Sequence, residues 1–508
     1  MTTNGSSRGF SYPFFVARDL DGLAALLVDN LVNLLIIAVT CIKVIGMSPA
    51  LVYGRILPGA AVSLVVGNLY YARMAARTAK KEGRSDITAL PYGINTVTVF
   101  AFLFLIMLPV ARATNNPEFA WKVGVAACIL SGVIEMLGAF VGSFIRRVTP
   151  RAALLTALAA IALSFIAMKP ALDIWGNPLV GLLPMAIILA SYLGGLRLPW
   201  GVPAGFVAIV IGMGLGWITG YLDWAKVLVA ANGIGLYPPV PTLGAAWNGL
   251  SSTLPYLAII VPTAVMTFVG TLQCVESAAA AGDSYPYKPV MIADGIGTLL
   301  GGLFGSCFPT TVYIGHPGYK EMGARQGYSI LNAVVITILC CCGLVELSLT
   351  LIPIPAVAGI LLFIGVVIGV QVFSVSSPAH YSAVIIGFIP SIAAWGAGLV
   401  ESTLQACGVS DVSILSALAA AGVDLEALRS LGQGSLFTSM ILSAAFIFII
   451  DKKWLAAAGW CGAAATASAL GFIHAPTLKW LAAPKLALAY AVCAAVCLII
   501  ALIRKRKA

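Results

Sequence analysis

The chain has 508 residues, of which 60% are hydrophobic and only 9% are charged. A soluble protein carries about a quarter charged residues, so this chain has too little polar surface to cover soluble domains. The composition indicates a polytopic membrane protein and excludes a soluble enzyme, a nucleic-acid binder and a secreted disulfide scaffold. The net charge of +10 does not indicate nucleic acid, because the basic residues are scattered among the predicted loops rather than gathered into a patch.

Apolar segments recur along the whole chain, and a helix needs about 20 mostly apolar residues to cross a bilayer. The N-terminal residues lack the basic and short apolar regions of a cleaved signal peptide, so the first segment is expected to direct insertion. The sequence predicts sixteen spans, at residues 24–46, 51–72, 93–111, 119–145, 149–168, 178–196, 201–220, 253–276, 289–305, 315–325, 328–352, 356–373, 380–402, 435–450, 454–473 and 484–503.

Lys and Arg residues follow the even-numbered segments. Together with those at the two ends of the chain, these loops hold 20 of the 29 basic residues. Basic residues remain on the cytoplasmic side of a membrane protein. The sequence therefore predicts a multi-pass protein of the cell inner (cytoplasmic) membrane with both termini cytoplasmic, and places the long loops 221–252 and 403–434 outside.

Two segments differ from ordinary spanning helices, at residues 88–95 and 308–318. Each carries a proline, then a tyrosine, and then a glycine near the expected start of a helix. They occupy the third and tenth positions, seven spans apart, so a duplication of seven spans would leave the two halves inverted in the membrane. Paired broken segments point to the binding site of a transporter. The alternative is two re-entrant loops or kinked helices that bind nothing.

Several short motifs are similar to the nucleobase–ascorbate transporters, also called nucleobase:cation symporter family 2 or xanthine/uracil permeases, which include the adenine/guanine permease branch. The matching stretches are 261–263 (VPT) and 270–272 (GTL) for the eighth span, 293–295 (ADG), 302–306 (GLFGS) and 309–313 (PTTVY) for the ninth and tenth, and 352–355 (IPIP) and 361–365 (LLFIG) for the twelfth. The resemblance covers roughly residues 20–450.

The resemblance implies an all-α polytopic fold with a seven-plus-seven inverted repeat and two short strands in the broken spans 3 and 10. It implies a core domain from spans 1–4 and 8–11, and a gate domain from spans 5–7 and 12–14. The predicted boundaries are 20–148 and 251–352 for the core, 149–250 and 353–450 for the gate, and 451–508 for two extra spans with a basic tail. It also implies a homodimer.

Two positions depart from the nucleobase-binding pattern. Acidic residues that hydrogen-bond the ring N–H groups of a base would stand at the positions of Thr267 and Gly315. The resemblance implies a symporter for a small, planar, nucleobase-like solute, coupled to a proton or sodium ion. Because both carboxylates are missing, the alternatives are a transporter of small anions such as sulfate, bicarbonate or carboxylates, whose known carriers share this architecture, and a passive channel.

Half-helices that start near Gly93 and Gly315 would point their free N–H groups at one cavity in mid-membrane. Such a site favours carbonyl groups, carboxylates and oxyanions; alternatively, these glycines serve only close helix packing. Asp29 and Asn33 lie one turn apart on one helix face. An acid inside a span indicates a functional site or a proton relay, unless it lies near the water interface.

The remaining candidates surround the broken segments. Tyr92 and Tyr313 would stack on a planar solute or anchor the strands through their hydroxyl groups. His316 would be a neutral donor to the substrate or a packing residue, and Asp294 would be a brace of the core or a functional group. Glu276 is expected at a solvated helix end. The predicted substrate-binding residues are Asp29, Asn33, Ala89, Tyr92, Gly93, Asn95, Thr267, Thr271, Tyr313, Gly315 and His316.

No catalytic motif is present. The sequence has no phosphate-binding glycine loop with a lysine, no metal-ligand cluster and no nucleophile with a plausible triad. The 11 cysteines lack the paired spacing of zinc or redox sites. The sequence therefore predicts a protein that is not an enzyme, with no cofactor, no metal and no nucleic-acid partner, whose partners are a small solute, a coupling proton or sodium ion, the lipid bilayer and a second copy of itself.

Overall fold

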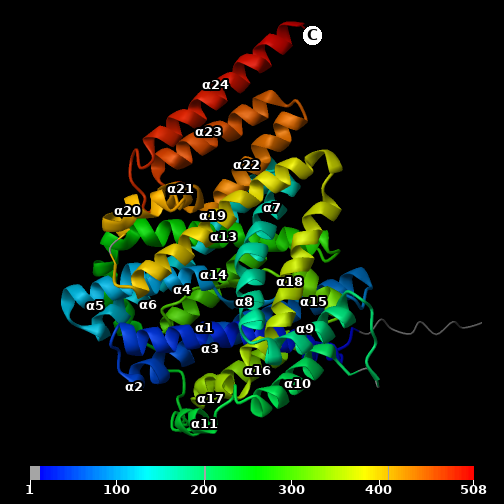
Figure 1. Cartoon of the computed structure of the whole chain (residues 1–508), viewed down its shortest axis with the longest axis vertical. Helices are drawn as coiled ribbons and strands as arrows, with labels where there is room; N and C mark the ends of the chain where they lie inside the picture. Colours follow the sequence, from blue (N-terminus) through cyan, green and yellow to red (C-terminus); the bar gives the residue numbers. More distant parts are fainter. Residues whose placement is uncertain (1–11, 200–201, 410, 508) are drawn as a thin grey trace, which may run out of the picture.

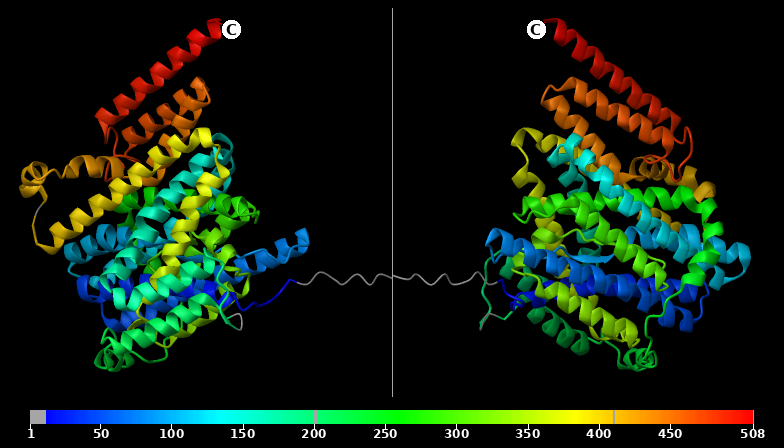
Figure 2. Two further views of the ribbon diagram at one scale, coloured as in Figure 1. Left: turned by 45° about the vertical axis from the view of Figure 1, so that its right-hand side comes forward. Right: turned by 180° about the vertical axis from the view of Figure 1, so that it is seen from behind.

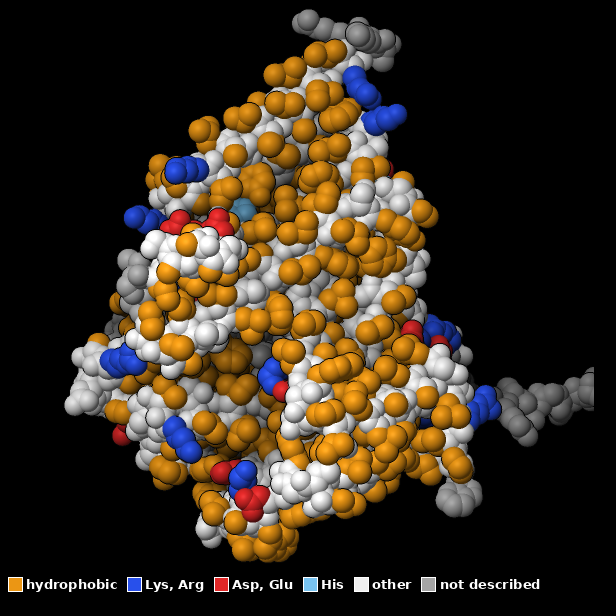
Figure 3. Space-filling model, viewed as in Figure 1, with side chains coloured by type: hydrophobic (Ala, Val, Ile, Leu, Met, Phe, Trp, Pro, Cys, Tyr) orange, Lys and Arg blue, Asp and Glu red, His pale blue; other side chains and the backbone are white. Residues whose placement is uncertain are grey.

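The computed structural model describes residues 12–199, 202–409 and 411–507. It is mostly helical, and its long helices lie side by side across the view in Figure 1. Hydrophobic side chains cover most of the face shown in Figure 3. The elements of the first half are α1 (Asp19–Val39), η1 (Thr40–Val44), α2 (Pro49–Leu51), η2 (Val52–Ile56), α3 (Leu57–Glu82), β1 (Tyr92–Ile94), α4 (Thr96–Ala101), η3 (Phe102–Met107), α5 (Leu108–Thr114), α6 (Pro117–Val148), α7 (Arg151–Ile161), η4 (Ala162–Ala167), α8 (Met168–Gly176), α9 (Pro178–Tyr192), α10 (Ala204–Ile218), α11 (Trp224–Ala231) and α12 (Leu243–Leu250).

The second half follows in the same order of long and short helices. Its elements are η6 (Ser251–Tyr256), α13 (Leu257–Ala280), α14 (Tyr287–Leu303), β2 (Thr310–Val312), α15 (His316–Met322), α16 (Gly327–Cys341), α17 (Val345–Leu351), α18 (Ile354–Val375), η7 (Pro378–His380), α19 (Tyr381–Ala406), α20 (Asp411–Ala420), α21 (Leu425–Gly432), α22 (Ser435–Ile450), α23 (Trp454–Leu470) and α24 (Pro484–Lys507).

The number of long spans is smaller than the sequence predicts. Among the described residues, eight helices are long and apolar enough to cross a membrane, or ten if the bent pairs α15–α16 and α21–α22 each count as one span. Each of the sixteen predicted segments contains a helix of the structure, but only about half of them are single long helices. Several of the predicted segments are short helices, such as α9, α10 and α23, and the tenth is the seven-residue helix α15. Apolar runs show that a segment is buried or faces lipid, but not how far it extends along the membrane normal.

Prolines explain three widened turns inside long helices. The π-helical turns η2, η3 and η4 each precede a proline, and the carbonyl four residues before Pro58, Pro109 and Pro170 lies inside the turn in each case. Proline has no N–H to offer that carbonyl, and its ring clashes with it in a regular helix. A local π turn relieves both problems, so these helices continue across the membrane instead of ending.

Each of the two broken segments contains a short strand, as predicted, and the two strands pair into one small antiparallel sheet. β1 pairs with β2, with Gly93 opposite Thr311 at the centre. The Tyr313 N–H donates to the Pro91 carbonyl (2.8 Å) and the Asn95 N–H donates to the Pro309 carbonyl (2.9 Å), which extends the pairing at both ends. Each proline favours an extended conformation for the residue before it, so the chain enters both strands already extended.

The packing of the helices follows the inverted repeat. Seven units of the first half correspond, in chain order, to seven units of the second half. The first set is α1, α3, β1–α4, α6, α7–α8, α9 and α10, and the second set is α13, α14, β2–α15, α16, α18, α19 and α22. Helix α6 packs against α14, and their counterparts in the other half, α16 and α3, also pack against each other. In the same way α7 packs against α19, and their counterparts α18 and α9 pack against each other. The fold is thus a seven-plus-seven inverted repeat that meets at the strand pair.

The last two helices lie outside this repeat. Helix α24 packs against α23, and only 6% of its apolar window is buried. Figure 2 shows α24 at one end of the molecule, away from the strands. The predicted two extra C-terminal spans thus form a peripheral hairpin.

Candidate substrate site at the paired strands

Hydroxyl groups hold the strand pair in an otherwise apolar interior. The Thr310 hydroxyl lies 2.6 Å from the Tyr92 hydroxyl and 2.5 Å from that of Ser63. The Thr298 hydroxyl on α14 accepts from the Thr310 N–H (3.1 Å) and contacts its carbonyl oxygen (3.1 Å). Tyr92 is fully buried. Of the two interpretations of Tyr92, the structure places it as an anchor of the strands.

Asp294 is a brace that joins four elements. Its carboxylate accepts from Thr271 (2.7 Å), the Thr311 hydroxyl (3.2 Å), the Val312 N–H (3.1 Å) and the Tyr71 hydroxyl. These groups come from α13, β2 and α3, so a single buried acid on α14 ties β2 to both other helices. Thr271, a predicted substrate residue, uses its hydroxyl in this brace.

Glu135 on α6 is a second fully buried acid near the strands. It accepts from Thr298 (3.1 Å) and from Ser131 (3.4 Å). Sequence reasoning did not single it out as functional, because no partner stands at helical spacing except Ser131, one turn before it. Thr298 is 163 positions away along the chain, and a polar residue in an apolar helix was the only available signal.

Asp29 and Asn33 lie beside the other edge of the strands. The Asn33 amide donates to the Tyr313 hydroxyl (3.1 Å), and this hydroxyl donates to the Ile94 carbonyl (2.8 Å). The Asn33 Oδ1 atom is buried, and no described residue bonds it. The Asp29 carboxylate is partly exposed and forms no hydrogen bond or ion pair with any described residue. This face of α1 thus presents two side chains, a carboxylate and an amide, with oxygen atoms that no described residue bonds.

The start of α4 joins Asn95 to Thr267. The Asn95 Oδ1 atom caps α4 by accepting from the Thr98 N–H (3.2 Å), and its amide donates to the Thr267 hydroxyl (2.9 Å). The Thr267 hydroxyl in turn donates to the Thr263 carbonyl. A neutral amide and a neutral hydroxyl therefore stand at the positive end of a half-helix, where the sequence departs from the nucleobase-binding pattern.

The two predicted glycines allow close packing. A Cβ atom at Gly93 would lie 2.2 Å from the Tyr313 ring, so the ring crosses the strand at this position. Gly315 caps α15 with a φ of +141°, and a Cβ there would lie 3.0 Å from Ile364 on α18. The structure thus places side chains against both glycines, as the packing alternative expects.

His316 and Ala89 lie in a separate polar cluster at the end of α15. The His316 Nε2–H donates to the Thr88 carbonyl (3.1 Å) and lies 3.3 Å from Asp283. The Ala89 N–H donates to the Arg325 carbonyl (2.8 Å). Asp283 is fully buried and also accepts from Lys320 and from the Thr88 N–H. The structure therefore does not bring His316 and Ala89 together with Asp29.

The charges of this cluster compensate one another. Burial opposes ionisation of Asp283, but the bonds from His316 and Lys320 outweigh it and lower the pKa of this carboxyl. The bidentate bond from Arg84 lowers the pKa of Asp86 to about 2. Sequence reasoning missed the cluster because its members come from three distant loops and helices.

Glu276 is not a solvated helix end. Its side chain is 4% exposed and pairs with Arg146 (3.1 Å) and Arg151 (2.5 Å), and it accepts from the Tyr287 hydroxyl (2.8 Å). The expectation of a solvated carboxylate is therefore wrong, because the two arginines of the α6–α7 connection fold over the end of α13. Within residues 12–199, 202–409 and 411–507, no group of three or more His, Cys, Asp or Glu side chains could hold a metal ion.

Comparisons with known proteins correct the family prediction. No protein-family model matches the chain, and no curated protein matches it. Similar solved structures include the transmembrane domain of a cyanobacterium bicarbonate transporter, BicA (TM-score 0.43, 13% identity, covering 75% of this chain and 96% of that chain). Another is SLC26A9 (TM-score 0.37, 13% identity, covering 72% of this chain and 63% of that chain).

The predicted nucleobase–ascorbate family is wrong. The similar structures are of the SLC26 and BicA type and not nucleobase–ascorbate transporters. The predicted nucleobase cargo and the xanthine/uracil permease assignment rested on this family, and the comparisons do not support them. The polytopic membrane fold and its two strands do not depend on it.

Proposed function

We propose that this protein is a secondary transporter that moves a small anion across the cytoplasmic membrane by alternating access. The start of α4 is the observation that carries the proposal. There, the free backbone N–H groups of a half-helix favour negative charge, and the neighbouring side chains of Asn95 and Thr267 are neutral and bond each other. A nucleobase would need carboxylate acceptors at this place, whereas an oxyanion or a carboxylate needs donors.

A coupling cation would bind at Asp29. An acid inside a span without a partner is energetically costly, and binding a proton or a sodium ion removes that cost. The unpaired Asn33 Oδ1 atom on the same helix face supplies a second oxygen for a cation. Neutralisation of Asp29 by the cation also removes the Coulomb repulsion between this carboxylate and a nearby anion, which couples the two binding events.

Alternating access would use the contacts between the predicted core and gate. Helix α15 meets α18 where Gly315 and Gly318 face Ile364, and the Asp21 carboxylate accepts from the Gly205 N–H at the start of α10 (2.8 Å). Each contact joins a predicted core residue to a predicted gate residue. The proposal includes a homodimer with both termini in the cytoplasm, and no enzymatic activity.

Solid-supported membrane electrophysiology on proteoliposomes tests this function. Bicarbonate, the solute from which the BicA transporter takes its description, is applied with sulfate and small carboxylates, and uracil and xanthine are applied as neutral controls. We expect transient currents with at least one anion that grow when an inward proton or sodium gradient is imposed. Because one monovalent anion carried with one proton or sodium ion moves no net charge, uptake of each radiolabelled anion is measured as well. For every anion, the absence of both current and uptake above the level in protein-free liposomes would refute anion transport.

The role of Asp29 has its own variant and control. We expect Asp29→Asn to lose the stimulation by the cation gradient while anion binding persists. Asp223→Asn is the matched control, because Asp223 caps α11 outside the strands and asparagine caps a helix equally well. Cation-stimulated uptake that is unchanged in Asp29→Asn would exclude this residue as the coupling site.

A further inference from the structure

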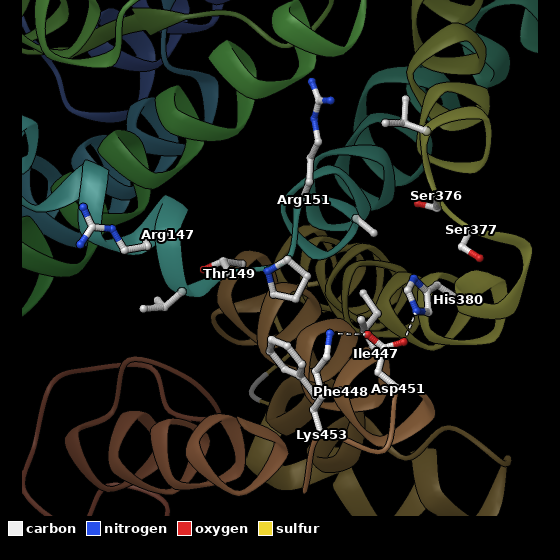
Figure 4. A pocket seen from close by; sticks show the side chains of 14 residues that line it. Arg147, Thr149, Arg151, Ser376, Ser377, His380, Ile447, Phe448, Asp451 and Lys453 are labelled. Carbon is white, nitrogen blue, oxygen red and sulfur yellow. Dashed lines mark hydrogen bonds and ion pairs between the residues drawn. The ribbon is translucent and has the colours of Figure 1, made fainter. Parts of the chain in front are cut away.

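Glu135 on α6 is a buried acid without a basic partner. It is 1% exposed, and no Lys, Arg or His side chain among the described residues forms an ion pair with it. Acids elsewhere in the protein have such partners. Asp451, which lines a cavity at the ends of the helices, is bonded by His380 (2.7 Å) and Lys453 (3.1 Å), as Figure 4 shows. A buried carboxylate without a cation is unstable, and such a group commonly takes up a proton instead.

The Thr298 hydroxyl on α14 has one hydrogen atom and two oxygen atoms that compete for it. The Glu135 Oε2 atom and the Thr310 carbonyl oxygen both lie 3.1 Å from this hydroxyl. The backbone bonds of the strand pair alternate in direction, so the N–H and carbonyl groups of Thr310 point away from β1 and toward α14. The Thr310 N–H donates to the Thr298 hydroxyl (3.1 Å), and the Thr310 carbonyl depends on the same hydroxyl for its hydrogen bond.

Counting the hydrogen atoms assigns the protonation state of Glu135. If Glu135 is ionised, the single hydrogen of Thr298 has to serve two acceptors, and one of them stays without a partner. If Glu135 is protonated, its O–H donates to Thr298, and the Thr298 O–H donates to the Thr310 carbonyl. The Thr298 hydroxyl then accepts two hydrogen bonds and donates one, which is the full capacity of a hydroxyl group. The second Glu135 oxygen accepts from Ser131 (3.4 Å), so a proton on Glu135 gives each of these buried groups a partner.

Asp294 keeps the negative charge of this region. It lies one turn before Thr298 on α14, is 1% exposed and interacts through space with Glu135. Its carboxylate accepts from the hydroxyl groups of Tyr71, Thr271 and Thr311 and from the Val312 N–H. Four donors stabilise this carboxylate through charge-assisted bonds, whereas Glu135 has only two hydroxyl neighbours. Two buried negative charges without a cation repel each other, so the proton belongs on the acid with fewer donors.

We propose that Glu135 binds a proton in the folded protein and is a positioning residue for β2. The proton lies between the Glu135 carboxyl group and the Thr298 hydroxyl, and it directs the Thr298 O–H toward the Thr310 carbonyl. None of the titratable groups that interact with Glu135 among the described residues carries a positive charge. These groups are Asp294, Tyr92 and Cys128.

The proton has a consequence for the charge of the strand pair. With Glu135 protonated, this region carries one buried negative charge, on Asp294, instead of two. This consequence rests on the proposed function, because an anion at the start of α4 meets less Coulomb repulsion from one carboxylate than from two.

Infrared spectroscopy of the purified full-length protein tests for this proton, because a protonated carboxyl group has a carbonyl stretching band that a carboxylate lacks. The protein is held at neutral pH in dodecyl maltoside, a detergent without carbonyl groups. It is made by cell-free synthesis with ordinary glutamate or with glutamate that carries a heavy carbon isotope in its side-chain carboxyl group. The label shifts the band of a glutamic acid but not that of an aspartic acid. We expect the wild type to show a band that shifts with the label, and a spectrum without such a band would overturn the proposal.

Variants assign the band to Glu135. We expect the band to be lost in Glu135→Gln, whose amide can still donate to Thr298. Glu276→Gln is the matched control, because Glu276 is also buried but is paired with Arg146 and Arg151, and we expect this variant to keep the band. A band that persists undiminished in Glu135→Gln would refute the assignment.

The position of the band tests the donation to Thr298. Loss of the O–H hydrogen bond raises the carbonyl stretching frequency, so we expect the band at higher frequency in Thr298→Ala. Ser63→Ala is the control, because the Ser63 hydroxyl lies 2.5 Å from that of Thr310 and does not bond Glu135. An unshifted band in Thr298→Ala would contradict the positioning role. The labelled wild type and Thr298→Ala test the proposal even where Glu135→Gln does not fold, and none of these spectra needs a solute, so a failure of anion transport is a separate outcome.

Discussion

Replacing Gly93 by alanine tests whether the ring of Tyr313 holds the strand pair together. An added Cβ atom would lie 2.2 Å from the ring carbon Cζ and 2.5 Å from the hydroxyl oxygen of Tyr313. The ring must therefore move and lose its bonds to the Ile94 carbonyl (2.8 Å) and the Asn33 amide (3.1 Å). Overpacking costs about 1–3 kcal/mol, and each hydrogen bond contributes about 0.5–1.5 kcal/mol. We expect Gly93→Ala to lower the free energy of unfolding by about 2–6 kcal/mol.

Unfolding of the purified protein in mixed micelles by added sodium dodecyl sulfate measures this change. Gly214→Ala is the control, because a Cβ at Gly214 meets nothing within 4 Å and alanine suits a helix better than glycine does. In a Tyr313→Ala background the space is open, so Gly93→Ala should then cost less than about 1 kcal/mol. An equal loss in both backgrounds, or no loss in either, would refute the steric argument.

Two further predictions concern charges at the helix ends. We expect Glu276→Gln to lower the free energy of unfolding by about 1–3 kcal/mol. This is less than the cost of about 3–5 kcal/mol for breaking a fully buried pair, because Arg146 and Arg151 are 51% and 43% exposed. A variant as stable as the wild type would show that these ion pairs contribute nothing. The pKa of Asp86 falls from 3.8 to about 2 because of its bond from Arg84, so its contribution is present above pH 4 and is lost as the pH falls toward 2. We expect the melting temperature to drop between about pH 4 and pH 2, and Asp86→Asn to show a smaller drop over this range. An identical drop in the variant would contradict this.

The strands were predictable because local chemistry determines them. Pro91 and Pro309 extend the residues before them, and 310–312 is a run of β-branched residues, which favour strands. The pairing partner also followed, since an inverted repeat brings the third and tenth segments together. In contrast, the length of each span was not predictable, because π turns let helices continue through prolines that the sequence marks as helix breakers.

The contacts of individual side chains depend on distant parts of the chain. Glu276 finds Arg146 across 130 positions, and His316 finds the Thr88 carbonyl across 228, so neither pair leaves a local pattern. The motif at 309–313 explains why the family prediction failed. The hydroxyls of Thr310 and Thr311 bond the neighbouring Thr298 and Asp294, so the motif reports how the strands are held and does not identify the solute.

The strand pair has a consequence for the biosynthesis of the protein. Residue 94 of β1 leaves the ribosome long before residue 310 of β2 is made. Unpaired backbone groups at membrane depth are destabilising by several kcal/mol each, so β1 cannot settle in the hydrocarbon core until its partner arrives. The first half of the chain therefore stays incompletely inserted, or in contact with water, until the second half is made. Pairing of β2 with β1 then satisfies the backbone groups of both strands in one step.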